Sequence, residues 1–247
     1  KTHAQVPTVL IRDDSIRVFF ASRPRQDLSL TTFVDLDIND PSIVLYENPK
    51  PILQLGGIGE FDEHGIMPSS IINKDGLIYL YYSGWSRGHS LPYHNYTGLA
   101  ISEDGGNTFQ KFSKGPIIDR SPYELYSATS PCVYYDKKWH MWYSSGTNWF
   151  KINDKYEHSY DIKYAWSNDG LDWNQTNSIT IAQKDKFEAL TRPTVIKMNK
   201  TYHMWFAYRG SKGFRNGGES YNIGYANSQD LESWIRKDLN KSLNYSK

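Results

Sequence analysis

The chain has 247 residues and a formal net charge of +1, and this balance argues against nucleic acid or an anionic membrane as a partner. No apolar stretch approaches the ~18–20 residues that span a bilayer, no signal-peptide core is visible, and the single Cys132 excludes an internal disulfide. We therefore expect a cytoplasmic protein without a metal site or a cofactor. Aromatic residues make up 15% of the chain, which favours strands and is also typical of sites where flat rings stack on sugars.

Four prolines, each at the start of an apolar run, divide the chain into repeats. They are Pro7, Pro68, Pro131 and Pro193, at intervals of 61, 63 and 62 residues. A fixed period of this length indicates a repeat architecture. Proline is tolerated at the start of a strand, because the hydrogen-bond ladder has not yet begun there.

Each repeat continues with the same succession of elements. A short turn follows the proline run, and then come an aromatic second run, a third run and a short fourth run. In the last three repeats the third run closes on a Ser-x-Asp sequence, at Ser102, Ser167 and Ser228. Four short strands per repeat, joined by Gly, Asn and Asp turns, predict a β-propeller blade.

The predicted fold is all-β, because no useful length of sequence shows a helical period of 3.6 residues. We expect a single β-propeller domain over residues 1–247, with four-stranded antiparallel blades at approximately 1–60, 61–122, 123–186 and 187–240. Propellers close with about four to eight blades. The chain therefore forms either a four-bladed ring or most of a ring with one more blade.

Two sets of loops are predicted to share one face of the propeller. Because antiparallel strands alternate in direction, the loop that leads into the first strand of a blade lies on the same face as the loop between strands two and three. The tight turns lie on the opposite face. Lead-in loops lie nearest the propeller axis, so their polar side chains would surround a central depression suited to a polar ligand.

Three lead-in loops carry an acid directly after an aromatic residue, at Asp62, Glu124 and Glu188. Cleavage of a glycosidic bond needs one carboxylic acid to protonate the leaving oxygen and one carboxylate to activate water or attack directly. We predict Glu124 as the general acid, Asp62 or Glu63 as the base or nucleophile, and Glu188 as a modulating residue or hydroxyl ligand.

A structural role for these acids is the alternative. An acid at the same place in three repeats could bind backbone N–H groups and lock neighbouring blades. Glu63 and His64 are less repeat-like than the lead-in acids, which favours function for this pair. The aligned Tyr96, Tyr160 and Tyr221 recur in register and are predicted to pack between blades.

The other candidates are polar or aromatic residues of the same loops. Arg192 has no counterpart in the other lead-in loops, and Arg209 and Arg215 suit a phosphate or carboxylate, with a solvated loop as the alternative. The loop histidines are either ligand contacts or solvated side chains. The predicted substrate-binding residues are His3, Gln5, Arg23, His64, Trp85, Arg87, His94, Asn148, His158, Arg192, Arg209, Arg215 and Glu219.

The repeat resembles that of a known group of enzymes. Proline-opened first strands, a second strand such as WHMWYSSG, a third such as IKYAWSNDGLDW and acidic lead-in loops resemble the five-bladed β-propeller glycosidase superfamily. That superfamily includes arabinanases, xylosidases, invertase-like fructosidases and β-mannoside phosphorylases. GWSRGHSLPYHNYTGLAISEDGG is similar to uncharacterised members linked to bacterial surface-polysaccharide synthesis. The resemblance, over residues 1 to about 238, implies a five-bladed type with four blades in this chain, a sugar substrate and axial catalytic carboxylates.

The chain departs from this superfamily at the residues before the prolines. The glycosidases commonly place an Asp directly before the first proline, where this chain has Val6, and acids near the next two, where it has Met67 and Ser130. The acids of this chain lie five to seven residues before the prolines. The catalytic residues of the superfamily therefore do not carry over position by position.

Three functions follow from these observations. The favoured one is a carbohydrate-active enzyme that cleaves a glycosidic bond. The alternatives are a glycosyltransferase or phosphorylase that uses a nucleotide sugar or phosphate on the same scaffold, and a propeller that binds sugar without catalysis. The expected partner is accordingly a carbohydrate or a nucleotide sugar.

Overall fold

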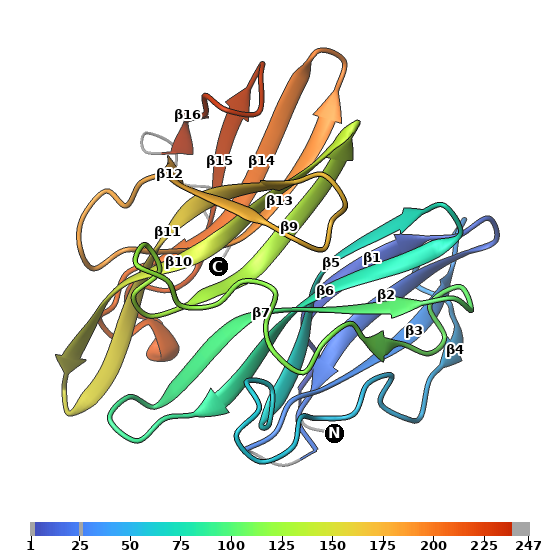
Figure 1. The fold of residues 1–247 in the computed structure, drawn as a ribbon, viewed down its shortest axis with the longest axis horizontal. Coiled ribbons are helices and arrows are strands. Elements are labelled where there is room, and N and C mark those ends of the chain that lie inside the picture. Colours follow the sequence, from blue (N-terminus) through green and yellow to red (C-terminus); the bar gives the residue numbers. More distant parts are fainter. Residues whose placement is uncertain (1–2, 25–26, 239–247) are drawn as a thin grey trace. The chain divides into compact units, whose positions relative to one another are not determined.

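A computed structural model describes residues 3–24 and 27–238. Within these ranges the only helix is the short 3-10 segment η1 (Phe214–Asn216), and no helix is long and apolar enough to cross a membrane. The chain divides into two compact units, Lys1–Asp119 and Arg120–Lys247, each with two sets of four antiparallel strands (Figure 1). The predicted all-β fold of four-stranded blades is confirmed. The predicted end of the last blade, at residue 240, lies outside the described residues.

The first unit contains blades one and two. A parallel bridge between Ser29 and Gly65 joins them, and the interior side chains, Phe19 and Leu80 among them, form one buried hydrophobic cluster. Antiparallel neighbours follow sequence order in both blades. The strands are β1 (Gln5–Ile11), β2 (Ser15–Ser22), β3 (Leu30–Asp37) and β4 (Val44–Glu47), then β5 (Gly65–Lys74), β6 (Leu77–Arg87), β7 (Tyr93–Ser102) and β8 (Gln110–Lys111).

The second unit contains blades three and four. A parallel bridge between Tyr160 and Ala189 links the third strand of one blade to the first strand of the next, and Trp142 and Leu190 belong to the buried cluster of this unit. The strands are β9 (Ala128–Asp136), β10 (Lys138–Ile152), β11 (Lys155–Ser167) and β12 (Asn174–Ile181), then β13 (Ala189–Met198), β14 (Thr201–Arg209), β15 (Asn222–Ser228) and β16 (Ile235–Arg236).

The Ser-x-Asp sequence builds the same turn in three blades. In blade three, Gly170 N donates to Ser167 Oγ at 2.9 Å and Leu171 N donates to Asp169 Oδ1 at 2.8 Å. The hydrogen bond from Leu171 and its neighbours hold the pKa of Asp169 below its ordinary value. Asp and Ser are preferred in such turns because their side chains cap free backbone N–H groups.

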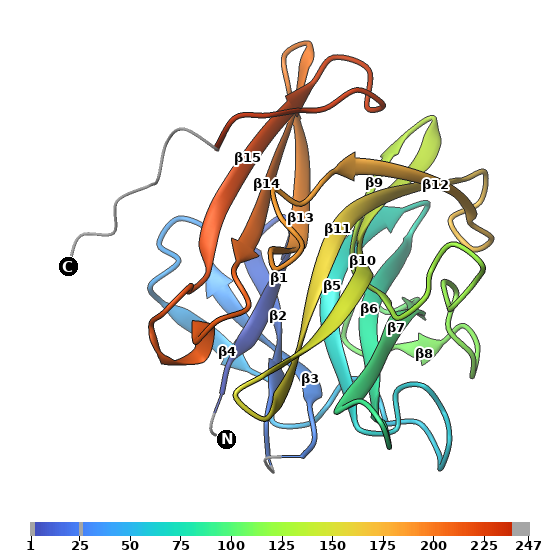
Figure 2. The same cartoon turned by 90° about the vertical axis from the view of Figure 1, so that its left-hand side faces the viewer.

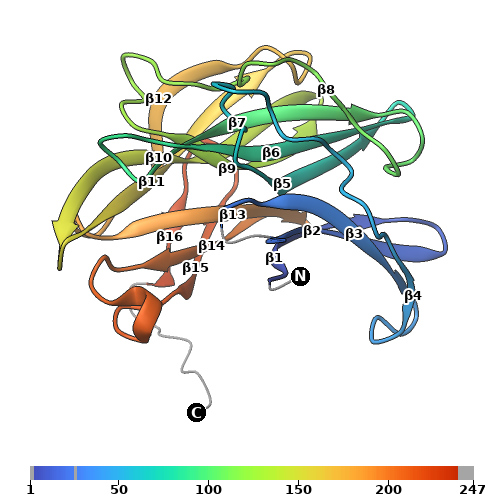
Figure 3. The ribbon, with the colours of Figure 1, turned by 90° about the horizontal axis from the view of Figure 1, so that it is seen from below.

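The β10–β11 hairpin is the longest element of the second unit. Its paired residues run from Trp139–Ser167 to Ile152–Lys155. Figures 2 and 3 show the tip of this hairpin beside the loop that carries η1, between β14 and β15. The hairpin therefore carries residues of strands ten and eleven out to the loop face of blade four.

Candidate functional site

The three lead-in acids are buried rather than presented to solvent. Asp62 and Glu124 have 0% of their surface exposed and Glu188 has 1%. A buried carboxylate is costly unless charge and hydrogen-bond partners compensate it. Each of the three has a cation from its own blade.

Asp62 is held by side chains of blade two. Its Oδ2 accepts from Tyr82 Oη at 2.9 Å and pairs with Lys111 Nζ at 2.7 Å, whereas Oδ1 has no hydrogen-bond partner among the described residues. Burial, followed by the charge of Asp62, raises the pKa of Tyr82. A Cβ atom at Gly84 would lie 2.7 Å from Asp62 Cβ, so the glycine makes room for the acid.

Glu124 is enclosed in the same way in blade three. Oε1 accepts from Tyr143 Oη at 2.8 Å and from Lys163 Nζ at 3.1 Å, and Oε2 accepts from Ser145 Oγ. Lys163 also donates to the carbonyl of Tyr123 at 2.7 Å. Burial and the charge of Glu124 raise the pKa of Tyr143. Both carboxylate oxygens are thus occupied by residues of blade three.

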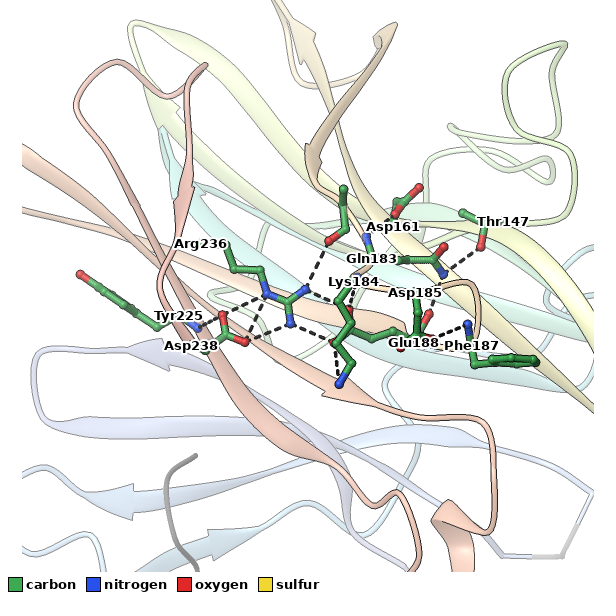
Figure 4. A network of polar contacts seen from close by, with 11 residues as sticks. Thr147, Asp161, Gln183, Lys184, Asp185, Phe187, Glu188, Tyr225, Arg236 and Asp238 are labelled. Carbon is green, nitrogen blue, oxygen red and sulfur yellow. Dashed lines mark hydrogen bonds and ion pairs between the residues drawn. The ribbon is translucent and has the colours of Figure 1, made fainter. Parts of the chain in front are cut away.

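Glu188 has a different partner, as Figure 4 shows. Arg236 donates to it bidentately, from Nη1 to Oε2 and from Nη2 to Oε1, both at 2.9 Å. Lys184 N adds a third hydrogen bond at 2.8 Å, and Asp238 binds the far side of the guanidinium. Phe206 occupies the place of the hydroxyl-bearing tyrosines of blades two and three. In blade four Arg236 provides the hydrogen bonds and the positive charge that a tyrosine and a lysine provide in blades two and three.

Glu63 and His64 are half-buried and differ from the lead-in acids. Glu63 Oε2 accepts from Gly59 N at 3.0 Å. The His64 ring lies 5.8 Å from the ring of Trp85, and its Nδ1 accepts from Arg87 N at 3.4 Å. The structure therefore brings together three predicted binding residues of blade two, namely His64, Trp85 and Arg87.

The remaining candidates of the first unit lie in small groups. Arg23 Nε donates to Gln5 Oε1 at 3.1 Å, which joins two predicted residues of blade one. His3 is exposed. His94 is half-buried and lies against the backbone of Gly88, where an added Cβ would be 2.9 Å from its Nε2.

Three predicted residues, His158, Arg209 and Arg215, converge in the second unit, near the tip of the β10–β11 hairpin. His158 contacts Trp149, with ring centroids 4.8 Å apart, and Arg209 Nη2 lies 3.3 Å from His158 Nε2. Burial, then the charges of Arg209 and Arg215, hold the pKa of His158 well below its ordinary value. A neutral imidazole is therefore held next to two guanidiniums.

Arg209 is an unusual cation because it is 2% exposed and has only neutral acceptors. It donates to the carbonyl of Gly210 at 2.8 Å, to that of His158 at 3.2 Å and to Tyr221 Oη at 3.3 Å. Its Cζ lies 3.7 Å from the centre of the Phe214 ring. Among the described residues no carboxylate lies within ion-pair distance of it. A buried charge without a counter-charge is a candidate for binding a ligand.

The other candidates of blades three and four flank this cluster. Arg215 pairs with Glu157, which is 6% exposed. Glu219 Oε2 accepts from Lys212 N at 3.0 Å, and Asn148 Oδ1 accepts from Trp149 N at 3.1 Å. The contacts of Arg215 and Glu219 hold the loop between β14 and β15 in shape, whereas that of Asn148 lies within β10.

Arg192 has a strained backbone, with φ of 54°, as do Val6 and Ser130, each with φ of 51°. All three directly precede the proline of a first strand, and the pairing register shifts at the same place. A left-handed φ costs an L-residue about 1–2 kcal/mol. Such bulges re-aim side chains and concentrate at functional sites. Burial lowers the pKa of Arg192.

Two buried acids of strand β11 are absent from the predicted set. Asp161 is 8% exposed, and the one hydrogen bond that its side chain makes with the described residues, from Gln183 N to Oδ1, measures 2.8 Å. Burial raises the pKa of Asp161, the hydrogen bond from Gln183 and the charge of Lys163 oppose this rise, and the charges of Glu188 and Glu124 add to it. Glu157 has one carboxylate oxygen, Oε2, without a hydrogen-bond partner among the described residues. Neither acid falls in a lead-in loop, so the repeat pattern could not single them out.

Two cavities border the loop between β14 and β15. One, of about 300 Å³, is lined by Arg209, Lys184, Lys212, Glu188 and Glu219, among others. The other, also of about 300 Å³, is lined by Glu157 and Arg215. Volumes of this size suit a small ligand such as one sugar ring. In the part of the chain that is described, no group of three or more His, Cys, Asp or Glu residues is arranged to hold a metal ion.

Comparison with known proteins places this geometry among carbohydrate enzymes. The family described as "Glycosyl hydrolases family 32 N-terminal domain" matches residues 46–191, more than half of the chain. A relative named "Uncharacterized protein MT1551", from Mycobacterium tuberculosis, is 32% identical over 237 residues, which cover 95% of this chain and 76% of the relative.

Solved structures agree in fold. A structure described as "Glycoside hydrolase" superposes with a TM-score of 0.71 at 15% identity, over 94% of this chain and 72% of that one. A sucrose-6-phosphate hydrolase from Lactobacillus gasseri superposes with a TM-score of 0.69 at 15% identity, over 94% of this chain and 47% of that one. The fold is that of the β-propeller glycoside hydrolases, which confirms the predicted resemblance.

Proposed function

The chain belongs to the family described as "Glycosyl hydrolases family 32 N-terminal domain", and from that premise we propose that it is a carbohydrate-active enzyme that acts on a glycosidic bond. The observation that carries the proposal is the extent of the family match, which includes all of blades two and three and the start of β13. The matched residues contain the acids Asp62, Glu124 and Glu188.

Cleavage of a glycosidic bond requires a proton on the leaving oxygen, and we propose Asp161 as its donor. A general acid works best when its environment favours the protonated form. Asp161 meets this condition, since burial and two neighbouring carboxylates raise its pKa. Its Oδ2 has no hydrogen-bond partner among the described residues and is not among the fully buried polar atoms. That oxygen is therefore not fully buried.

The second carboxylate of the reaction would take a proton from water or attack the sugar directly. Within Arg120–Lys247, the acids whose charges act on Asp161 are Glu124 and Glu188. Both have their two oxygens occupied by cations, hydroxyls or backbone N–H groups, which favours a supporting role around Asp161 over that of the second carboxylate. The roles predicted from the sequence for Glu124, Glu188, Asp62 and Glu63 stay predictions.

The test of Asp161 uses two leaving groups. We would assay wild type against a panel of 4-nitrophenyl and 2,4-dinitrophenyl glycosides, and then assay Asp161→Asn on the sugar that reacts. Removal of a general acid typically lowers turnover by about 10²–10⁴-fold. The dinitrophenol group needs no proton to leave, so its release should fall far less. An equal loss with both leaving groups would assign Asp161 a structural role.

The same assay separates catalysis from binding alone. If wild type binds saccharides in calorimetry but releases no product from any of them, the proposal fails in favour of a non-catalytic sugar-binding propeller. If it neither binds nor cleaves any of them, the assignment to carbohydrate fails altogether.

A second candidate, a glycosyltransferase or phosphorylase, is favoured by one observation. Arg209 is buried without a counter-charge beside a cavity that Lys184 and Lys212 also line. Guanidinium and ammonium groups are the usual partners of phosphate. Inorganic phosphate or a nucleotide sugar should then raise the melting temperature of wild type and not of Arg209→Gln. Lys200→Gln, in an exposed turn, is the control and should respond like wild type.

A further inference from the structure

The cavity between the β10–β11 hairpin and the η1 loop is distinct from the cavity that Glu188 and Arg209 line. It has a volume of about 300 Å³, and its wall combines Glu157 and Lys155 of the hairpin with Phe214 and Arg215 of the loop. Figures 2 and 3 show these two segments side by side. The wall combines apolar surface with several polar side chains, and an occupant that brings hydrogen-bonding groups suits the latter.

Glu157 supplies the most specific observation. Its side chain is 8% exposed and its Oε1 pairs with Arg215, but Oε2 is buried and has no hydrogen-bond partner among the described residues. More than nine-tenths of buried polar groups in native proteins have a partner. A carboxylate oxygen only accepts, so the partner that fits Oε2 is a donor.

Arg215 supplies hydrogen-bond donors to the same cavity. Its side chain is 52% exposed, and its Cζ lies 4.2 Å from the centre of the Phe214 ring. Arg209 lies over the same ring at 3.7 Å. The ring is therefore engaged by guanidiniums and holds Arg215 in position. The guanidinium keeps further N–H groups for an acceptor.

We propose that this cavity is a saccharide subsite, in which one hydroxyl of a sugar ring donates to the Glu157 carboxylate and its neighbour accepts from Arg215. Vicinal hydroxyls each donate and accept, so they match an acid beside a guanidinium. A cation is a poor occupant, because Lys155 and Arg215 already outnumber Glu157 in charge. The inference rests on the proposed carbohydrate function and adds to it the place of a second sugar ring.

The two cavities border the same loop, and this arrangement indicates how long the saccharide is. The loop of residues 210–221 has Gly210 and Lys212 on the first cavity, next to Arg209 at the end of β14, and Ser211 and Arg215 on the second. Two sugar-sized spaces on one loop fit an oligosaccharide rather than a single sugar.

The test measures affinity with saccharides of two lengths. We would titrate wild type by calorimetry with sucrose, mannobiose and xylobiose, and with 1-kestose, mannotriose and xylotriose. For the trisaccharide that binds, Glu157→Gln should lower affinity by at least about tenfold, the loss expected for a hydrogen bond to a charged group. Glu232→Gln makes the same change in charge at an exposed turn and should bind like wild type.

A second variant keeps the test decisive if Glu157→Gln folds poorly. Lys155→Met alters an exposed residue of the same wall and should weaken trisaccharide binding about threefold. If Glu157→Gln folds and its affinity for the trisaccharide is unchanged, the subsite is overturned. If Glu157→Gln does not fold, an unchanged affinity in Lys155→Met overturns it instead. A wild type that binds none of the saccharides would instead contradict the proposed function, and the subsite with it.

Discussion

Two kinds of buried carboxylate occur in the unit Arg120–Lys247. Glu124 and Glu188 are 0% and 1% exposed, and both oxygens of each accept from a cation, a hydroxyl or a backbone N–H. Asp161 and Glu157 are 8% and 6% exposed, almost as buried, yet one oxygen of each lacks a hydrogen-bond partner in the described part of the chain.

We propose from this difference that burial alone does not identify a working acid. Removing one partner of a buried, fully compensated pair leaves an uncompensated charge, so such pairs belong to the scaffold. A buried carboxylate oxygen without a hydrogen-bond donor destabilises the folded protein, and a ligand that donates a hydrogen bond to it removes that cost. We therefore assign support to Glu124 and Glu188, and chemistry or binding to Asp161 and Glu157.

The largest effect is expected from Lys163→Met, which leaves Glu124 buried beside an apolar side chain. Lys163 is 7% exposed, and its ammonium group also bonds to Tyr123 and Asn177. Loss of one partner of a buried pair costs about 3–5 kcal/mol. Chemical unfolding of the two proteins measures the loss directly.

Lys151→Met provides the control for that measurement. Lys151 pairs with Asp154 at the exposed end of the hairpin, and such pairs contribute at most about 0.5–1 kcal/mol. Equal stability losses in the two variants would mean that Glu124 is not held by its cation and would remove the contrast with Asp161.

A smaller gain is expected from Arg192→Gly. Glycine relieves about 1–2 kcal/mol of left-handed strain and costs about 0.5–1 kcal/mol in flexibility, so the variant should be more stable by about 0.5–1 kcal/mol. Lys137→Gly, in an exposed turn with φ of 62°, should gain similarly. Only Arg192→Gly should also lose saccharide affinity. A stability loss with unchanged affinity would make Arg192 a packing residue.

The smallest effect is the pH dependence of Asp161→Asn. The pKa of Asp161 in the folded protein is raised above its ordinary value of 3.8. The contribution of Asp161 to folding stability is therefore fully present below pH 3.8 and is lost as the pH rises through the folded-state pKa. Asn can still accept from Gln183. At pH 8 the variant should melt about 1–2 °C above wild type, and the gap should close toward pH 4. A gap independent of pH would mean that Asp161 does not titrate in this range.

Much of the fold was predictable from the sequence because its signals are local. A proline at the head of each first strand, aromatic second strands and Ser-x-Asp turns each act over a few residues, and together they repeat at a fixed interval. The strained conformation of Val6, Ser130 and Arg192 was not predictable, because the residue before a proline is ordinarily extended.

The candidate site was predictable only in part. Arg209, Arg215 and His158 lie in segments that the sequence predicts as loops on one face. The structure places His158 in β11 and Arg209 at the end of β14, and it brings the three together. The cation partners of the lead-in acids do not all come from the same strand of the blade. Lys111 and Arg236 lie in the fourth strands β8 and β16, whereas Lys163 lies in the third strand β11, so no single spacing reveals them. Asp161 and Glu157 are hidden inside a strand, where an acid is usually exposed.

One paired measurement tests the contrast between supporting and working acids most directly. Glu124→Gln and Asp161→Asn would each be assayed for unfolding free energy and for turnover of the same 4-nitrophenyl glycoside. Our account predicts that Glu124→Gln loses several kcal/mol of stability, with turnover that follows the folded fraction, and that Asp161→Asn keeps its stability and loses turnover by about 10²-fold or more. A stable Glu124→Gln without turnover, beside a fully active Asp161→Asn, would contradict it.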